Sequence, residues 1–272
     1  MFRPNRLKAR LRAGQKSFGT WLQSASPTFA EMAAVAGFDF IIMDEEHGTG
    51  ELQHAIDMMR ATSCTETTFV IRVPSSDPTY MRRLVDAGAE GLLVPMVESG
   101  EQARAIVEAV RFPPRGKRGN AFDATRSSSF GLVADYYERA DDNLLIMVQI
   151  ETQAGVDNAE EIAAVDSVDV IFIGPTDLSG SMGMPGQTGA PEVNAQIERA
   201  MAAARAAGKP LVTVPRAGRS SNQLYDEGFL GVAVASEIYF YRLGITQLMK
   251  EWREYNGVAG QEPAAAKSSY GR

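Results

Sequence analysis

Cysteine is almost absent from this sequence. Cys64 is the only one in 272 residues, which excludes a disulfide framework and a zinc site built from cysteines. Long hydrophobic runs are also missing: the longest, such as residues 144–148, reach about five residues, whereas a membrane-spanning helix needs about 20. The basic segment 1–6 is not followed by the apolar stretch of a secretory signal. We therefore expect a cytoplasmic protein with no membrane partner.

Positive charge is scarce too. The 27 Lys and Arg residues are outnumbered by 34 Asp and Glu, which gives a net charge of −7 and a pI near 5.1. Nucleic-acid binding depends on clustered cations, so we expect no nucleic-acid partner. Apolar residues make up 44% of the chain and charged residues 22%, as in ordinary folded globular proteins.

Eight short apolar runs alternate with longer amphipathic segments. Continuous apolar runs such as residues 170–173 are typical of parallel strands buried on both faces. The runs are 17–22, 38–43, 68–73, 91–97, 144–150, 168–173, 210–214 and 231–235. Helices are predicted at 27–36, 51–62, 78–87, 100–110, 154–165, 191–207, 220–227 and 237–255. This pattern predicts an α/β fold, a single (β/α)₈ TIM-type barrel over residues 1–255 with a flexible tail at 256–272, and a doubly wound sheet is the alternative.

Reactive side chains in such a barrel follow the carboxyl ends of the strands. Asp44 and His47 follow the second run, Arg72 ends the third, Glu151 follows the fifth and Asp177 follows the sixth. Each has an ordinary alternative, a surface histidine for His47 or a residue at a helix start for the carboxylates. Their coincidence on one rim favours a functional site.

The residue types indicate the chemistry. Two carboxylates on neighbouring strand ends, without cysteine, suit a hard divalent cation such as Mg²⁺ or Mn²⁺. Such a site leaves room for an α-keto acid, whose enolate charge the metal and Arg72 stabilise. His47, beside Asp44 and Glu46, offers a base near neutral pH. A Schiff-base mechanism is disfavoured because no lysine follows a strand; the lysines are Lys8, Lys16, Lys117, Lys209, Lys250 and Lys267.

These residues stand in segments that resemble the HpcH/HpaI aldolases, a family also called class II pyruvate aldolases. The resemblance covers residues 18–248, and the order and spacing of its motifs make it specific. The motifs include DEEHG at 44–48, VIRVP at 70–74, FPPRGKRG at 112–119, VQIET at 148–152 and GPTDLS at 174–179.

The resemblance implies a metal-dependent aldolase that cleaves or forms 4-hydroxy-2-keto acids through a metal-bound pyruvate enolate and an aldehyde. It implies that Glu151 and Asp177 bind a divalent cation, Mg²⁺, Mn²⁺ or Co²⁺. It also implies that Arg72 contacts the keto-acid oxygen and that His47, supported by Asp44, handles the proton.

The resemblance extends to substrate binding and assembly. Gln149 is similar to a pocket-lining glutamine of the family, and the backbone around Thr176 is implied to hold the keto-acid carboxylate. Relatives form hexamers, as trimers of dimers that exchange their last helix, so residues 237–255 are expected to swap between subunits.

Other functions stay open on the sequence alone. An oxaloacetate decarboxylase or a CoA-thioester lyase uses the same enolate chemistry. A non-catalytic keto-acid-binding barrel needs no base beside the carboxylates. A phosphate-binding isomerase requires a glycine-rich anion site after the last two strands, for which residues 214–218 are a weak match.

Four segments depart from the family pattern: Glu45, residues 235–237 in place of a Gly-x-Asp after the last strand, residues 212–216 without the usual glycine, and residues 120–126. Glu45 stands where relatives often carry a small or neutral residue. The long connection 111–131 is of a length that is usually functional or disordered, and it carries several cations in an acidic chain. These cations either shape the turn or are solvated, or one or two of them face the barrel mouth and bind an anionic or polyhydroxylated aldehyde. Arg126 is the candidate for this substrate contact.

Overall fold

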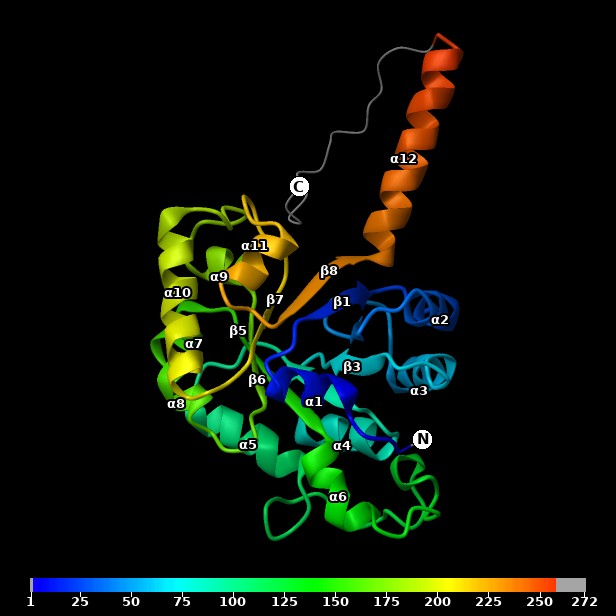
Figure 1. Cartoon of the computed structure of the whole chain (residues 1–272), viewed down its shortest axis with the longest axis vertical. Coiled ribbons are helices and arrows are strands. Elements are labelled where there is room, and N and C mark those ends of the chain that lie inside the picture. The colour runs from blue at the N-terminus through cyan, green and yellow to red at the C-terminus, as the bar shows by residue number, and fades with distance from the viewer. Residues whose placement is uncertain (1, 258–272) are drawn as a thin grey trace.

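The computed structural model describes residues 2–257, and in them eight parallel strands form one closed barrel. The strands follow one another around the barrel in sequence order, and the last pairs with the first (Figure 1). They are β1 (Ser17–Leu22), β2 (Phe40–Asp44), β3 (Thr68–Arg72), β4 (Gly91–Val94), β5 (Leu145–Ile150), β6 (Val170–Ile173), β7 (Leu211–Thr213) and β8 (Gly231–Ser236). The predicted TIM-type barrel is confirmed, with every expected run present and its ends moved by at most a few residues.

Between consecutive strands, helices return the chain from the carboxyl end of one strand to the amino end of the next, and a last helix follows β8. They are α2 (Pro27–Val35), α3 (Leu52–Ala61), α4 (Pro78–Asp86), α5 (Gly100–Val110), α6 (Tyr136–Asn143), α7 (Gln153–Asp157), α8 (Ala159–Ala163), α9 (Pro175–Ser181), α10 (Pro191–Ala206), α11 (Ser221–Asp226) and α12 (Glu237–Tyr255). A short 3₁₀ helix, η1 (Arg126–Ser128), lies between α5 and α6. The single helix predicted at 154–165 is two helices, because Asn158 leaves helical geometry and donates to the Glu98 carbonyl at 2.7 Å.

A helix that the sequence pattern did not predict closes the amino end of the barrel. Helix α1 (Arg6–Arg12) buries Leu7 and Leu11 against the inward-facing side chains of the strands, among them Phe40 and Val70. The alternate strand residues face outward and pack under the helices. The amino end is thus plugged with apolar side chains, and the polar strand ends remain at the opposite end.

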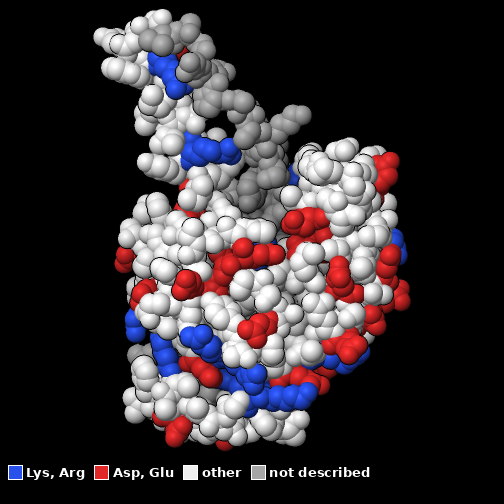
Figure 2. All heavy atoms as spheres, turned by 180° about the vertical axis from the view of Figure 1, so that it is seen from behind, with Lys and Arg blue, Asp and Glu red and all other residues white. Residues whose placement is uncertain are grey.

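Helix α12 stands away from the barrel (Figure 1). Glu237 is its only buried residue. Its exposed surface is largely uncharged (Figure 2), with apolar side chains at Ile238, Phe240, Tyr241, Leu243, Ile245, Leu248, Met249, Trp252 and Tyr255. On the barrel, α2 also exposes Met32 and Val35, to 60% and 72%. Both apolar surfaces are therefore open to contact with another molecule.

No helix within residues 2–257 is long and apolar enough to cross a membrane. Of the expected tail at 256–272, residues 258–272 lie outside the described part of the chain.

Candidate active site at the carboxyl end of the barrel

Asp44 and Arg72 end neighbouring strands and lie directly opposite each other in the β2–β3 register. The Arg72 Nε donates to Asp44 Oδ1 at 3.0 Å and its Nη2 donates to Oδ2 at 2.7 Å. Both side chains are buried. This two-pronged geometry fixes the plane of the guanidinium group, so its orientation at the barrel mouth is set before any substrate arrives.

Asp44 also shapes the loop that carries His47. Its Oδ1 accepts the backbone N–H groups of Glu46 and His47, each at 3.1 Å. Gly48 then folds back so closely that a Cβ there would lie 2.1 Å from the Asp44 carbonyl oxygen, which no other residue tolerates. The expected support of His47 by Asp44 therefore acts through the backbone, and the imidazole is exposed at the mouth.

Arg72 has two further neighbours. Its Nη1 lies 3.1 Å from Glu46 Oε2, and its guanidinium carbon lies 4.6 Å from the centre of the Trp21 ring. Burial by itself raises the pKa of Asp44, but the hydrogen bonds and charge of Arg72 outweigh it and hold that pKa below its usual range. Asp44 and Arg72 are therefore a stable ion pair at neutral pH.

Glu151 lies just beyond β5 and is buried. Its Oε1 accepts the Met96 N–H at 2.8 Å, and its Oε2 accepts a short hydrogen bond from Gln149 Nε2. Gly174 leaves the space for this carboxylate, because a Cβ there would lie 2.7 Å from Glu151 Oε2. Burial raises the pKa of Glu151 to about 8, and the charges of Asp177 and Glu46 add to the effect. A cation at this position would relieve that cost.

Asp177 and Thr176 lie in the first turn of α9, directly after β6. Both are exposed at the mouth. The first turn of a helix has N–H groups without intrahelical acceptors, and the first turn of α9 is at this rim. The arrangement supplies a carboxylate and backbone donors side by side.

One cavity of about 200 Å³ joins these groups. It is lined by six of the residues that the sequence indicated, Asp44, His47, Arg72, Gln149, Thr176 and Asp177, and by Trp21, Gln23, Phe172, Gly174, Pro175, Val214 and Pro215. Glu151 lies immediately behind Gln149 and Gly174. No lysine is among the residues that line it.

The donor set fits a hard cation held by few protein ligands. No group of three or more His, Cys, Asp and Glu side chains in the described chain is placed to hold a metal. Glu151 and Asp177 offer carboxylate oxygens, the ligands that Mg²⁺ prefers while it keeps several waters. The Glu46 carboxylate also raises the pKa of Glu151, so the site has an excess of negative charge that a divalent ion would balance.

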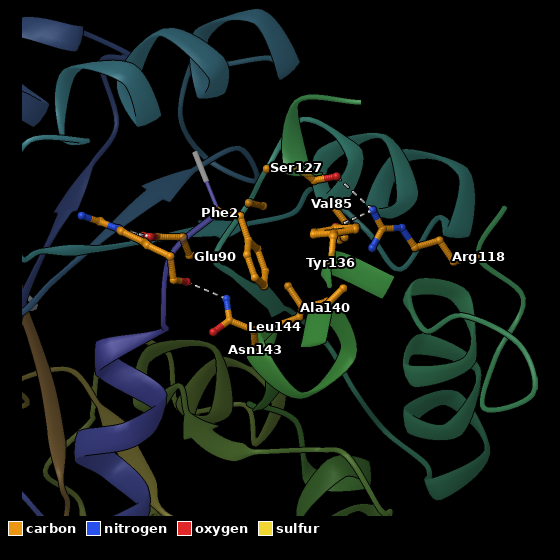
Figure 3. Close-up of a pocket in the computed structure, with 12 residues that line it drawn as sticks. Phe2, Val85, Glu90, Arg118, Ser127, Tyr136, Ala140, Asn143 and Leu144 are labelled. Carbon is orange, nitrogen blue, oxygen red and sulfur yellow. Dashed lines mark hydrogen bonds and ion pairs between the residues drawn. The ribbon is translucent and has the colours of Figure 1, made fainter. Parts of the chain in front are cut away.

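The expectation that Arg126 faces the mouth of its own barrel is wrong. Its Nη1 donates to the Ala87 carbonyl at 2.8 Å, beside Gly88 and before β4. This is the amino end of the strands, because residues 111–131 connect a helix to the next strand and every such connection lies there. The same end holds a cavity of about 30 Å³, where Arg118 contacts Ser127 and Tyr136 (Figure 3).

Sequence reasoning missed Trp21 near the end of β1 and Gln23 just after it, and it considered Val214 and Pro215 only as part of a weak match to an anion site. Trp21 and Gln23 alternate inward at the end of β1, and an inward-facing pair at a strand end is the signal that could have identified them. The Nε1 of Trp21 and the Oε1 of Gln149 are buried without a partner. Unpaired polar atoms of this kind in a cavity are satisfied by water or by a ligand.

Comparison with known proteins agrees with this geometry. Residues 17–242 match the profile of the HpcH/HpaI aldolase/citrate lyase family. A hydroxypyruvate/pyruvate aldolase of Agrobacterium fabrum is 37% identical over 98% of both chains. A 5-keto-4-deoxy-D-glucarate aldolase of Klebsiella pneumoniae is 36% identical over 92% of this chain and 98% of its own.

The chain belongs to the HpcH/HpaI family. Its membership makes it an enzyme of the lyase type and confirms the resemblance seen in the motifs.

Solved structures extend the comparison. A family member from Burkholderia cenocepacia superposes with a TM-score of 0.87 at 32% identity, covering 92% of this chain and 99% of that one. The citrate synthase SbnG gives 0.82 at 25% identity, covering 92% and 98%. Protein CitE of Mycobacterium tuberculosis, solved with magnesium and pyruvate, shares the fold with a TM-score of 0.54 at 20% identity, covering 84% and 87%.

Proposed function

We propose that this enzyme is a divalent-metal-dependent aldolase that joins pyruvate to an aldehyde, or cleaves the resulting 4-hydroxy-2-keto acid. The observation that carries the proposal is the buried Glu151, which lies just behind the cavity that Asp177 and Arg72 line and is close enough for the charges of both to shift its pKa. Relatives that cover nearly the whole chain are pyruvate and keto-sugar-acid aldolases, which supports the same chemistry here.

Glu151 and Asp177 would hold the cation, as the donor set and its excess negative charge suggest. A bound divalent ion polarises the keto oxygen as a Lewis acid and offsets charge that develops on it. A protein of the same fold has been solved with magnesium and pyruvate, which supports Mg²⁺, or the similar Mn²⁺ or Co²⁺, as the ion.

The remaining residues bind substrate and move the proton. Arg72, fixed by Asp44, donates to the keto-acid oxygen, and the first-turn N–H groups at Thr176 hold the carboxylate. His47 accepts a proton from pyruvate C3 directly or through one water. The C3 carbon then bonds to the aldehyde carbon, and the aldehyde oxygen takes the proton back from His47, so no proton is lost or gained.

Among the lysines of residues 2–257, none lines the cavity, which gives no support to a Schiff base. Lys8 and Lys209 are both at the amino end of the barrel, where the Lys8 ammonium donates to the Leu144 carbonyl at 2.7 Å and that of Lys209 to the Val168 carbonyl at 2.7 Å. Neither can reach a substrate at the opposite end.

The assembly that we propose is a homo-oligomer, a hexamer of three dimers that exchange α12. The apolar side chains on α12, together with Met32 and Val35 on α2, support such an exchange. In this arrangement, α12 of one subunit packs against the exposed apolar side chains on the barrel of the next.

The test is metal binding and retro-aldol release of pyruvate from a panel of 4-hydroxy-2-keto acids. Glu151→Gln and Asp177→Asn should each abolish calorimetric Mn²⁺ binding and reduce turnover by about 10³-fold or more, the effect of losing several kcal/mol of charge stabilisation. Glu98→Gln, at an exposed position after β4 outside the cavity lining, is the matched control and should behave as wild type. Full activity in excess EDTA, or a borohydride-trapped lysine adduct, would contradict the proposal.

A further inference from the structure

The first turn of α12 is tied to the loop that follows β1. Glu237 accepts the backbone N–H of Gln23 at 2.8 and 3.1 Å through its two oxygens, and that of Ser24 at 2.6 Å. Its side chain is buried, whereas no other residue of the helix is. The first turn of α12 is therefore held beside the cavity, because Glu237 binds Gln23, which lines that cavity.

Ser236 fixes which way the Gln23 amide points. The Ser236 hydroxyl oxygen accepts the Tyr239 N–H as the N-cap of α12, so its single proton is free to be donated. It lies 3.0 Å from Gln23 Oε1. With its oxygen bound there, Gln23 turns its NH₂ group toward Asp44, and Nε2 donates to Asp44 Oδ2 at 3.3 Å.

The bond from Gln23 completes the set of donors around Asp44. The other donors are both prongs of Arg72 and the backbone N–H groups of Glu46 and His47. Asp44 thus holds the guanidinium group and the histidine loop together. Gln23 is the contact that links this carboxylate to Ser236 at the end of β8, the strand beside β1 in the barrel from which α12 continues (Figure 1).

We propose that Gln23 is a positioning residue. The position of the first turn of α12 sets, through Ser236, the orientation of the Gln23 amide, and this amide in turn positions Asp44. Asp44 then positions Arg72 and His47. The inference rests on the proposed function, since turnover is one of its measures. A side chain that merely filled the cavity wall would need no defined amide orientation. Gln23 has one, because its oxygen and its nitrogen have different partners.

The experiment compares Gln23→Met, which keeps the length and removes the amide, with Ser236→Ala and Ser236→Thr. Ser220→Ala is the matched control, because Ser220 also caps a helix, α11, and does not line the cavity. The measures are the kcat and KM of pyruvate C3 proton exchange by NMR with Mg²⁺ or Mn²⁺, and the melting temperature of each variant. Neutron crystal structures of wild type and Ser236→Ala, in which the amide oxygen and NH₂ are distinguished directly, give the orientation of the Gln23 amide independently of turnover.

Gln23→Met and Ser236→Ala should each lower kcat by about 3- to 10-fold, the equivalent of one hydrogen bond, with little change in KM. Threonine at 236 should restore kcat, and the Gln23→Met, Ser236→Ala pair should be less than additive. Ser220→Ala should lower only the melting temperature.

An unchanged kcat in Gln23→Met, equal kcat losses in Ser236→Ala and Ser220→Ala, or an amide that keeps its orientation in Ser236→Ala would overturn the inference. If wild type itself exchanges no proton, the proposed function fails, and the crystal structures still decide whether Ser236 orients Gln23.

Discussion

At the scale of single residues, one step along the backbone separates a side chain at the cavity from one buried in the wall. Asp44 faces the cavity, and Glu45 points the other way, toward Tyr80 on α4 and Gly50. The carboxyl oxygens of Glu45 are buried, and the Tyr80 hydroxyl is the polar group that faces them and opposes part of the effect of burial on the pKa. Burial raises the pKa of Glu45 to about 7, and the charges of Asp44 and Glu51 act in the same direction.

This buried acid should make stability fall as the pH rises. Because the pKa of Glu45 is higher in the folded state than its usual 4.5, the folded state binds the proton more tightly, and its advantage is lost between pH 4.5 and about 7. Moving a pKa from 4.5 to about 7 corresponds to about 3 kcal/mol. Glu45→Gln cannot titrate, so only the wild type should lose this stability as the pH rises. In urea titrations, the unfolding free energy of Glu45→Gln minus that of wild type should therefore be about 3 kcal/mol larger at pH 8 than at pH 4. A difference independent of pH would contradict the assignment.

The residues of the candidate site could be predicted from the sequence where they stand at the end of a recognisable apolar strand. Asp44, Arg72, Glu151 and Asp177 each follow a clear apolar run, and the closed barrel brings such positions to one rim. Trp21 and Gln23 were missed because they belong to or follow an apolar strand without a charged residue. Their role appears only when the inward face of β1 is known.

At the scale of elements, the direction of each connection decides what it can do. A segment that leads from a strand to a helix lies at the active-site end, and one that leads from a helix to a strand lies at the other. The connection 111–131 is of the second kind. Its charge suggested substrate binding, whereas Arg118 pairs with Asp86 at 2.7 Å and Arg126 binds the end of α4. Composition alone does not carry this directional information.

Arg126→Ala should therefore leave acceptor specificity unchanged. With pyruvate as the common donor, its rates on carboxylated and on neutral aldehydes should both stay within about twofold of wild type. Its unfolding free energy should fall by about 1–2 kcal/mol, because the Ala87 carbonyl loses a charged donor. Arg199→Ala, which removes an exposed ion pair with Asp157, is the control and should cost under about 1 kcal/mol. A selective loss on the carboxylated aldehyde would show that Arg126 reaches a substrate, in a neighbouring subunit of an assembly.

At the scale of the whole molecule, the pattern of apolar residues predicted the barrel, and α12 shows where that reasoning ends. The helix has the predicted bounds, yet almost none of its apolar surface is buried in its own chain. Amphipathic periodicity predicts that the apolar face of a helix is buried, but it does not show whether the same chain or another one buries it.

Leu248→Glu combined with Trp252→Glu should break the proposed assembly into monomers. Each buried apolar side chain contributes about 1.5–3 kcal/mol, and a two-fold interface loses both copies, so the dissociation constant should rise by at least about 100-fold. Light scattering after size exclusion measures the mass. Gln247→Glu adds one such charge at an exposed polar position of α12 and should leave the assembly intact. A wild-type protein that is already monomeric would contradict the exchange of α12.

The closure of the barrel by β1 and β8 has a consequence for synthesis on the ribosome. The partner of Gln23, Glu237, lies 214 residues later in the chain. Synthesis of that stretch takes roughly 10–40 s at about 5–20 residues per second. Until then β1 has a free edge that can pair with another nascent chain, and Asp44 lacks its link to β8. The contacts of Gln23 with Ser236 and Glu237 are therefore among the last of the site to form, and we expect fragments released before residue 236 to lack them.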